Sequence, residues 1–142
     1  MKIDLDYLKK LLEAMEAAPA PVFDIQELRA AGLDYNDDQF IFHMGILDDQ
    51  AFVQREDREP GFGFSRGLDG HEHWMPVPLR LTAQGHQFIE ALRNKEVFAT
   101  LKKGFKDASL ATLRDVSKKL LEAFVNKKIQ ELLKDPIGPI SE

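Results

Sequence analysis

The stretch Met75–Arg93, MPVPLRLTAQGHQFIEALR, decides the fold of this chain, because within it the hydrophobic residues change from a period of two to a helical period. Its first half alternates apolar residues with two prolines and an arginine, so we expect a strand with one face on a core. The core-facing residues are Met75, Val77, Leu79 and Leu81. Proline cannot donate a ladder hydrogen bond, so the prolines on the other face indicate an edge strand.

The second half of this stretch predicts a helix that begins directly after the strand. Thr82 is a good N-cap, and the apolar face of the helix carries Phe88, Ile89 and Leu92. The preceding residues predict three helices at about 5–18, 25–31 and 37–50, a strand from Phe52, and a long, mobile glycine-rich hairpin connection over 56–74. We therefore expect an α+β, mainly α fold: a winged helix-turn-helix-like body with a small antiparallel β-hairpin and a C-terminal helical extension.

Short polar or glycine residues mark the predicted helix ends. Suitable N-caps are Asp4 or Asp6 for the first helix, Asp24 for the second, Asn36 for the third, and Asp107 or Ser109 for the last. Gly32 follows the second helix at a C′ position, where glycine is favoured.

The residues after 94 predict a helical extension whose last helix is longer than a small body needs. Two apolar lines run along it to about Leu133: Leu113, Val116, Leu120 and Phe124, and beside them Leu121, Val125, Ile129 and Leu132. At ~1.5 Å per residue the helix is about 36 Å long. Its wide apolar face needs cover from the preceding helix or a second copy, so we expect a homodimer through this helix. The expected division is a body over 1–94, an extension over 95–134 and a disordered tail over 135–142.

The composition is that of a globular protein without cysteine chemistry. Hydrophobic residues make up 44% and charged residues 30% of the 142 residues, which is ordinary for a folded domain. The absence of cysteine excludes disulfides, thiolate zinc sites and cysteine nucleophiles. The N-terminus has no signal-peptide core, and no window approaches the ~20 apolar residues of a membrane span. We expect a cytoplasmic protein without a membrane partner.

Charge is unevenly distributed along the chain, although the net charge is only −5. Acidic residues dominate from Asp24 to Glu59, and basic residues dominate from Arg93 to Lys134. Such a chain can pair head to tail with itself or present its basic end to an acidic partner. The simpler interpretation is two solvated faces.

Three segments together resemble one known family. They are MKIDLDYLKKLLEAMEAAP at the N-terminus, FIFHMGILDDQAFV over 40–53, and LRLTAQGHQFIEALRNKEVF over 79–98. In these segments the chain resembles the small bacterial and phage proteins of domain-of-unknown-function family 2513, with Leu81-Thr82, Gly85-His86 and Phe88 as the most specific element. The resemblance covers most of the chain except the 56–74 connection and the tail. It implies a winged-helix-like body and a prophage setting, and it implies no catalytic residues.

The histidines are the only residues that suggest a metal site. Asp69, His71 and His73 lie two apart on an extended segment, a spacing at which imidazoles point the same way and could bind zinc. We favour solvated loop histidines, and we predict no metal and no cofactor. His43 is interpreted as a core-edge residue, and His86 as hydrogen-bonding to another element while Gly85 allows close backbone approach.

Two pairs of adjacent acids, Asp37-Asp38 and Asp48-Asp49, do not form a catalytic pair. Neighbours on a helix diverge by about 100°, so neither pair converges on one site. Helix-terminus electrostatics explain the acids better than catalysis does, because Asp37 and Asp38 lie where a helix N-terminus favours anions. Phosphate loops, nucleophile elbows and helical metalloprotease signatures are all missing, so we predict that the protein is not an enzyme.

Two functional hypotheses remain open. The first is a protein-interaction module with an unidentified partner, for which the candidate surface is Asp37, Asp38, Asp48 and Asp49. The second is a DNA-binding transcriptional regulator that contacts phosphates through the hairpin and the C-terminal lysines. Its candidate contacts are Arg55, Arg58, Arg66, Arg80, Lys118, Lys119, Lys127 and Lys128. The helix that would enter the DNA groove begins with acids and carries no lysine or arginine, which counts against the second hypothesis.

Overall fold

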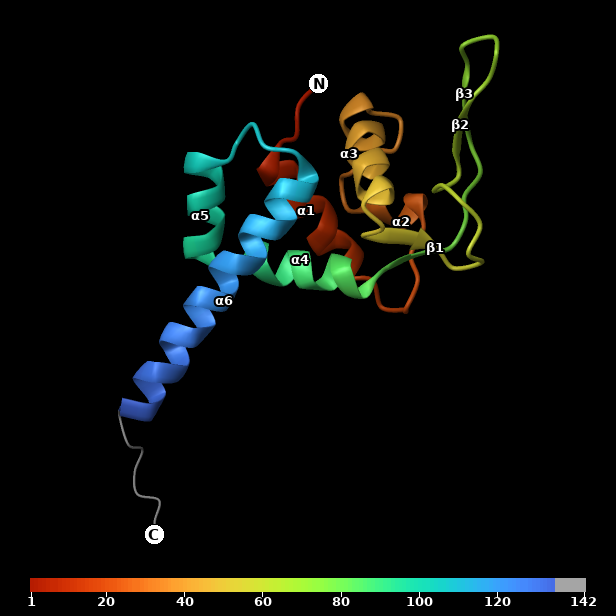
Figure 1. Cartoon of the computed structure of the whole chain (residues 1–142). Helices are drawn as coiled ribbons and strands as arrows, with labels where there is room; N and C mark the ends of the chain where they lie inside the picture. The colour runs from red at the N-terminus through yellow and green to blue at the C-terminus, as the bar shows by residue number, and fades with distance from the viewer. Residues whose placement is uncertain (135–142) are drawn as a thin grey trace.

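The computed structural model describes residues 1–134 (Figure 1). The helices are α1 (Leu5–Glu16), α2 (Ile25–Ala30), α3 (Asp38–Asp49), α4 (Ala83–Arg93), α5 (Lys95–Gly104) and α6 (Leu110–Lys134). The strands are β1 (Val53–Arg55), β2 (Phe64–Arg66), β3 (Glu72–Trp74) and β4 (Leu79–Leu81). The predicted α+β, mainly α fold with a small antiparallel hairpin and a C-terminal helix is confirmed. The tail predicted to be disordered, 135–142, lies outside the described residues.

The strand predicted over Met75–Leu81 is shorter and less peripheral than expected. Only Leu79–Leu81 pairs with β1, in antiparallel register, while the side chain of Met75 is 56% exposed. The prediction of an edge strand is also wrong at Leu79, which exchanges two backbone hydrogen bonds of 2.8 Å with Phe23 on its other side. Beyond Leu79 the ladder is incomplete, because Pro78 accepts the Glu56 N–H at 3.0 Å but has no N–H to donate in return.

The connection over 56–74 holds a second hairpin, in which β2 pairs with β3. The ring of Trp74 at its base packs against four aromatic rings. The centroid distances are 4.9 Å to Phe64, 5.4 Å to Tyr35, 5.9 Å to Phe62 and 6.0 Å to Phe40. Tyr35 precedes α3 and Phe40 lies within it, so this cluster fixes the hairpin base to α3. The sequence pattern did not predict the cluster.

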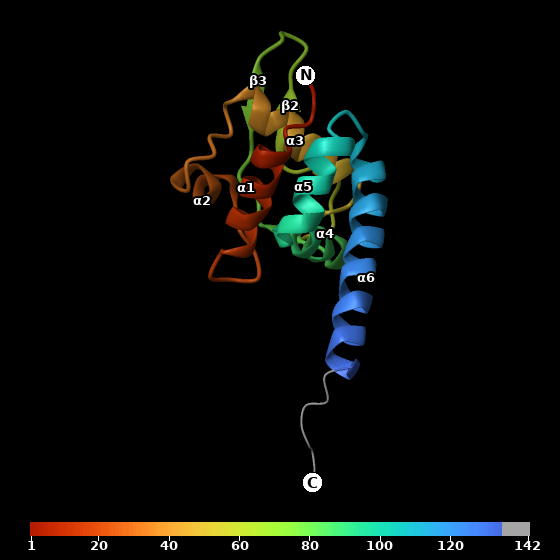
Figure 2. The ribbon, with the colours of Figure 1, turned by 90° about the vertical axis from the view of Figure 1, so that its left-hand side faces the viewer.

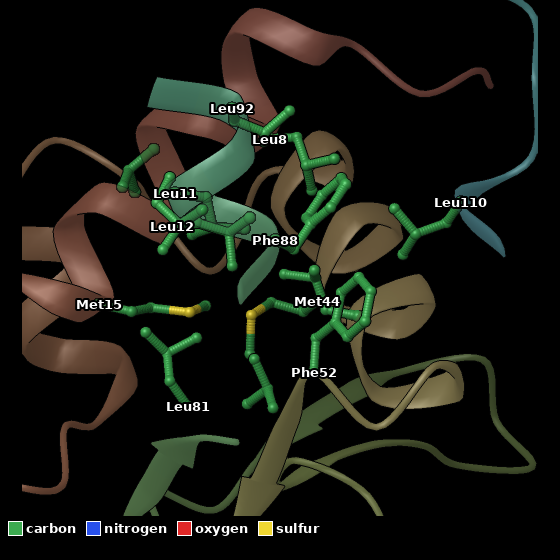
Figure 3. Close-up of a cluster of buried hydrophobic side chains, with 14 of the residues drawn as sticks. Leu8, Leu11, Leu12, Met15, Met44, Phe52, Leu81, Phe88, Leu92 and Leu110 are labelled. Atoms are coloured by element: carbon green, nitrogen blue, oxygen red, sulfur yellow. The ribbon is translucent and has the colours of Figure 1, made fainter. Parts of the chain in front are cut away.

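One hydrophobic core joins α1, α3 and α4 to the paired strands β1 and β4 (Figure 3). The rings of Phe52 and Phe88 stack in it with centroids 5.1 Å apart. The predicted apolar face of α4 is confirmed, since Phe88, Ile89 and Leu92 are all buried. Residues of α5 and α6 complete the same core: Val97, Leu101, Leu110 and Leu113. The predicted division at residue 94 stays a prediction.

Side-chain caps start most of the helices where the sequence predicts them. Asp4, Asp24, Thr82 and Ser109 each accept a backbone N–H in the first turn of the following helix. The predicted cap Asn36 is wrong, because Asp37 takes the N-cap position of α3 and makes no side-chain cap hydrogen bond. Asp34 instead accepts the Asn36 N–H at 2.9 Å, which places a turn just before the helix.

The last helix leaves the body halfway along its length. Leu110, Leu113 and Ser117 are buried, whereas the second half of α6 extends away from all other elements (Figure 2). The body therefore covers only the first half of the apolar face. Among residues 1–134, none of the helices is both long and apolar enough to span a membrane.

Candidate functional site

The outward face of α3 is the strongest candidate for a binding surface. Its inner residues, Phe40, His43, Met44 and Leu47, are fully buried. The outward line consists of Asp38, Phe42, Gly45 and Asp49, which follow one another at steps of four, three and four residues. We call this line, with its neighbours Asp37, Ile41, Ile46 and Asp48, the α3 face.

The α3 face is acidic at both ends and apolar between them. Asp37, Asp38 and Asp49 are exposed, and Asp48, Ile41 and Phe42 are partly exposed. None of the twelve residues of α3 is a lysine or an arginine. The face therefore has two negative ends about one helix length apart, with a small apolar patch in the middle.

The two acidic ends differ in what they do for the helix. Asp37 and Asp38 lie at the N-terminus, where the helix dipole stabilises negative charge. Asp48 and Asp49 lie at the C-terminus, where the dipole opposes negative charge. Partial burial and the neighbouring Asp49 raise the pKa of Asp48 above its usual range. Helix electrostatics thus account for the first pair but not for the second.

Gly45 lies in the middle of α3 with open space in front of it. A Cβ atom built at this position would meet no atom within 4 Å outside the chain neighbours and the helix's own backbone. Glycine inside a helix costs roughly 0.5–1 kcal/mol relative to alanine. No packing contact within the described residues requires a glycine at this position.

His43 secures α3 to the start of α1 from the inner side. Its Nε2 accepts the Asp4 N–H at 3.0 Å, and its Nδ1 lies 2.7 Å from the Gln39 carbonyl oxygen. Both contacts are satisfied when Nδ1 carries the only ring proton. Burial lowers the pKa of His43, although the Gln39 carbonyl and Asp4 oppose this shift. The core interpretation of His43 is confirmed, because the residue has no exposed surface.

Three of the four candidate arginines lie on strands, Arg55 on β1, Arg66 on β2 and Arg80 on β4, and Arg58 lies in the connection after β1. Arg55 is bound by Asp57 at 2.6 Å, and Arg66 lies 3.5 Å from Glu72. Arg58 and Arg80 both donate to the side-chain oxygen of Gln54, at 3.0 and 3.2 Å. Two of the four positive charges are therefore already neutralised by local carboxylates.

The candidate lysines, Lys118, Lys119, Lys127 and Lys128, are exposed on α6. The β2–β3 hairpin and the C-terminal end of α6 point in opposite directions from the body in both views (Figures 1 and 2). Arg66 on this hairpin and Lys127 and Lys128 on the second half of α6 therefore lie on opposite sides of the body.

The remaining histidines lie at exposed positions. Asp69 accepts the His71 N–H at 2.9 Å within the turn of the hairpin. In the part of the chain that the structure describes, no three His, Cys, Asp or Glu side chains gather to hold a metal ion. His86 Nδ1 lies 3.8 Å from Glu16, so the ring faces another element as predicted, but it does not make the predicted hydrogen bond.

Comparison with known proteins finds one relationship. The sequence model of a family described as "Hypothetical protein (DUF2513)" matches residues 2–111. The match spans the body and α5, and it ends just after α6 begins. The search of curated proteins and the search of solved structures both found no match.

Proposed function

Because the chain belongs to the family of hypothetical proteins DUF2513, whose description names no activity, we propose a function from the α3 face. The protein is a non-enzymatic module that binds another protein through this face. The partner segment that fits this face has basic residues at both ends and apolar residues between them. It would lie along α3, with its closest approach at Gly45.

The single observation that carries this proposal is Gly45. Gly45 weakens its helix and makes no packing contact that requires a glycine, so it leaves room for a group from outside the chain. Phe42 and Ile41 supply a partly exposed apolar patch next to it. Apolar patches of this kind, rimmed by charges, are typical of protein-binding surfaces.

The acids at the C-terminal end of α3 support the same proposal. Asp48 and Asp49 destabilise their own helix, and burial already disfavours the ionised form of Asp48. A basic group of a partner placed there would offset both effects. At the other end, Asp37 and Asp38 would attract a second basic group.

The DNA-binding alternative receives less support from the geometry. In helix-turn-helix proteins the recognition helix contacts the major groove with its N-terminal residues. In this chain those residues are Asp37 and Asp38, which repel phosphates. Arg66 on the β2–β3 hairpin and Lys127 and Lys128 on the second half of α6 lie on opposite sides of the body, so one copy of the chain does not present all the candidate contacts together.

A peptide-display selection on the folded protein tests the interaction proposal. Peptides are selected on the wild type and counter-selected on the Asp38→Lys/Asp49→Lys variant. We expect peptides with lysine or arginine on both sides of an apolar centre, which bind the wild type about tenfold or more tightly than the variant. A Glu13→Lys/Glu27→Lys protein is the matched control, since both residues are exposed on other helices. Selected peptides that bind all three proteins equally would contradict the proposal.

A gel-shift series with duplex DNA tests the alternative. We expect no shift at low salt and micromolar protein, because α3, the helix that would contact the major groove, begins with acids and repels phosphates. A shift that weakens steeply with salt, and whose salt slope decreases when Lys118, Lys119, Lys127 and Lys128 become glutamine, would favour the DNA-binding regulator instead.

A further inference from the structure

The second half of α6 carries an apolar stripe that the body does not cover. Four of the seven large hydrophobic residues that are exposed in residues 1–134 lie within the short stretch 125–133. Their exposed fractions are 43% for Val125, 48% for Ile129, 56% for Leu132 and 77% for Leu133. We call this projecting part of α6, residues 123–134, the overhang.

The overhang has no tertiary support of its own. Isolated helices shorter than about 12–15 residues are marginal in water, and most helical stability in proteins comes from packing of an apolar face. An apolar stripe that is both solvent-exposed and carried on a projecting helix therefore calls for a partner.

A groove lies at the root of the overhang, between α4 and α6. It has a volume of about 600 Å³, and Phe88 and Leu121 contribute its apolar lining. The residues 121, 125, 129 and 132 follow one another at steps of four, four and three, so the groove and the stripe share one face of α6. An element seated in the groove would thus continue along the overhang.

The charges of the groove and of the overhang are complementary. Three acids, Glu90, Asp115 and Glu122, and two basic residues, Arg114 and Lys118, line the groove, so its net charge is −1. Arg114 is held by Asp115 at 3.0 Å and by Gln50 at 3.0 Å. The overhang carries the basic residues Lys127, Lys128 and Lys134 against one acid, Glu131. A basic helix end with an apolar stripe therefore fits a groove that has an apolar lining and a small net negative charge.

We propose that two copies of the chain form an antiparallel dimer in which the overhang of each copy occupies the α4–α6 groove of the other. The groove is centred on residues 117–121 of α6, and the most exposed apolar residues are 129–133. Pairing these two segments reciprocally places the two-fold axis near Val125. The arrangement buries the apolar stripes of both copies. Each copy contributes the same surface, so the dimer is symmetric and leaves neither of these surfaces free for a third copy. It leaves the α3 face free and does not depend on the function proposed for that face.

Mass measurement by light scattering during size-exclusion chromatography tests the dimer. The wild type is expected at twice the chain mass of 16.2 kDa. Leu132→Asp is expected to raise the dissociation constant on the order of 100-fold and to give monomers at micromolar concentration. Ala123→Asp, on the opposite face of the same helix, is the matched control and should remain dimeric. Because both positions are exposed, neither substitution disturbs the core.

Engineered cysteines test the arrangement, because the chain has none of its own. Val125→Cys lies next to the two-fold axis, so under mild oxidation its cysteine is expected to form a disulfide with the same cysteine of the other copy. Ala123→Cys is not expected to form one. Gln87→Arg, an exposed change on the α4 side of the groove, is expected to weaken the dimer as Leu132→Asp does. A monomeric wild type overturns the proposal. So does a dimer that survives both Leu132→Asp and Gln87→Arg, or one in which Ala123→Cys crosslinks and Val125→Cys does not.

Discussion

Replacing Gly85 by alanine is expected to destabilise the protein by about 2 kcal/mol, because the new Cβ would collide with the neighbouring strand. That atom would lie 2.4 Å from the Phe52 carbonyl oxygen and 3.0 Å from a methyl group of Leu81. The same carbonyl accepts the Thr82 N–H at 3.0 Å, and the Thr82 hydroxyl donates to the Ala51 carbonyl at 2.6 Å. Moving α4 away to relieve the collision would strain both hydrogen bonds. The loss exceeds the 0.5–1 kcal/mol that alanine gains as a helix former.

Gly45→Ala is the matched control, because it is the same substitution inside another helix. No atom obstructs the new Cβ there, so we expect a gain of about 0.5–1 kcal/mol. Urea denaturation of the wild type and both variants gives the three unfolding free energies. Changes of the same sign in the two variants would show that the contacts of Gly85 and the open space at Gly45 are misassigned.

Replacing His43 by leucine is expected to cost about 2 kcal/mol at neutral pH, although the residue is buried and leucine is apolar. The substitution leaves the Asp4 N–H without its acceptor and removes the contact to the Gln39 carbonyl. A donor that is kept from water without a partner costs about 1–3 kcal/mol, and the hydrogen bond from Asp4 is partly buried. The exposed His86 provides the control, since His86→Leu loses only a contact of 3.8 Å to Glu16 and should change stability by less than about 0.5 kcal/mol.

His43 should also make the stability depend on pH. Its pKa in the folded protein is lowered by burial, whereas in the unfolded chain it is near the usual value of about 6.5. As the pH falls below that value, the unfolded chain binds a proton before the folded protein does, so the unfolding free energy decreases. The decrease ends once the pH is below the lowered folded pKa, and full stability returns above pH 7.

Melting curves between pH 7.5 and pH 5 measure this dependence. We expect the wild type and His86→Leu to lose stability on acidification, and His43→Leu to lose distinctly less. A His43→Leu protein with the same pH slope as the wild type would contradict the assignment, and the slope would then have to come from other groups.

The element order could be predicted from the sequence because the local signals agree with the packing. Thr82, Asp24 and Asp4 cap helices as predicted, and the apolar positions of α4 are buried. Two features were missed because a distant residue decides the outcome. The pairing of Leu79 with Phe23 joins residues 56 apart, and the cluster around Trp74 joins the hairpin to α3. No local period reveals either contact.

The candidate surfaces could be predicted only in part. The acids of α3 were named from the sequence, and the outward position of Asp38 and Asp49 follows from helical geometry. The open surroundings of Gly45 could not be predicted, because a glycine that is needed for packing and one facing open space look the same in a sequence. Comparing the surroundings of Gly85 and Gly45 separates these two cases.

The most direct test of the α3 face is a map of backbone amide NMR shifts recorded while a selected peptide is added to the wild type. We predict that the largest shifts lie in residues 37–49, that they include Gly45, and that Gly45→Ala weakens binding while it stabilises the fold. Shifts concentrated instead in the hairpin at 55–74 or in α6, with residues 37–49 unchanged, would contradict the assignment of function to this helix.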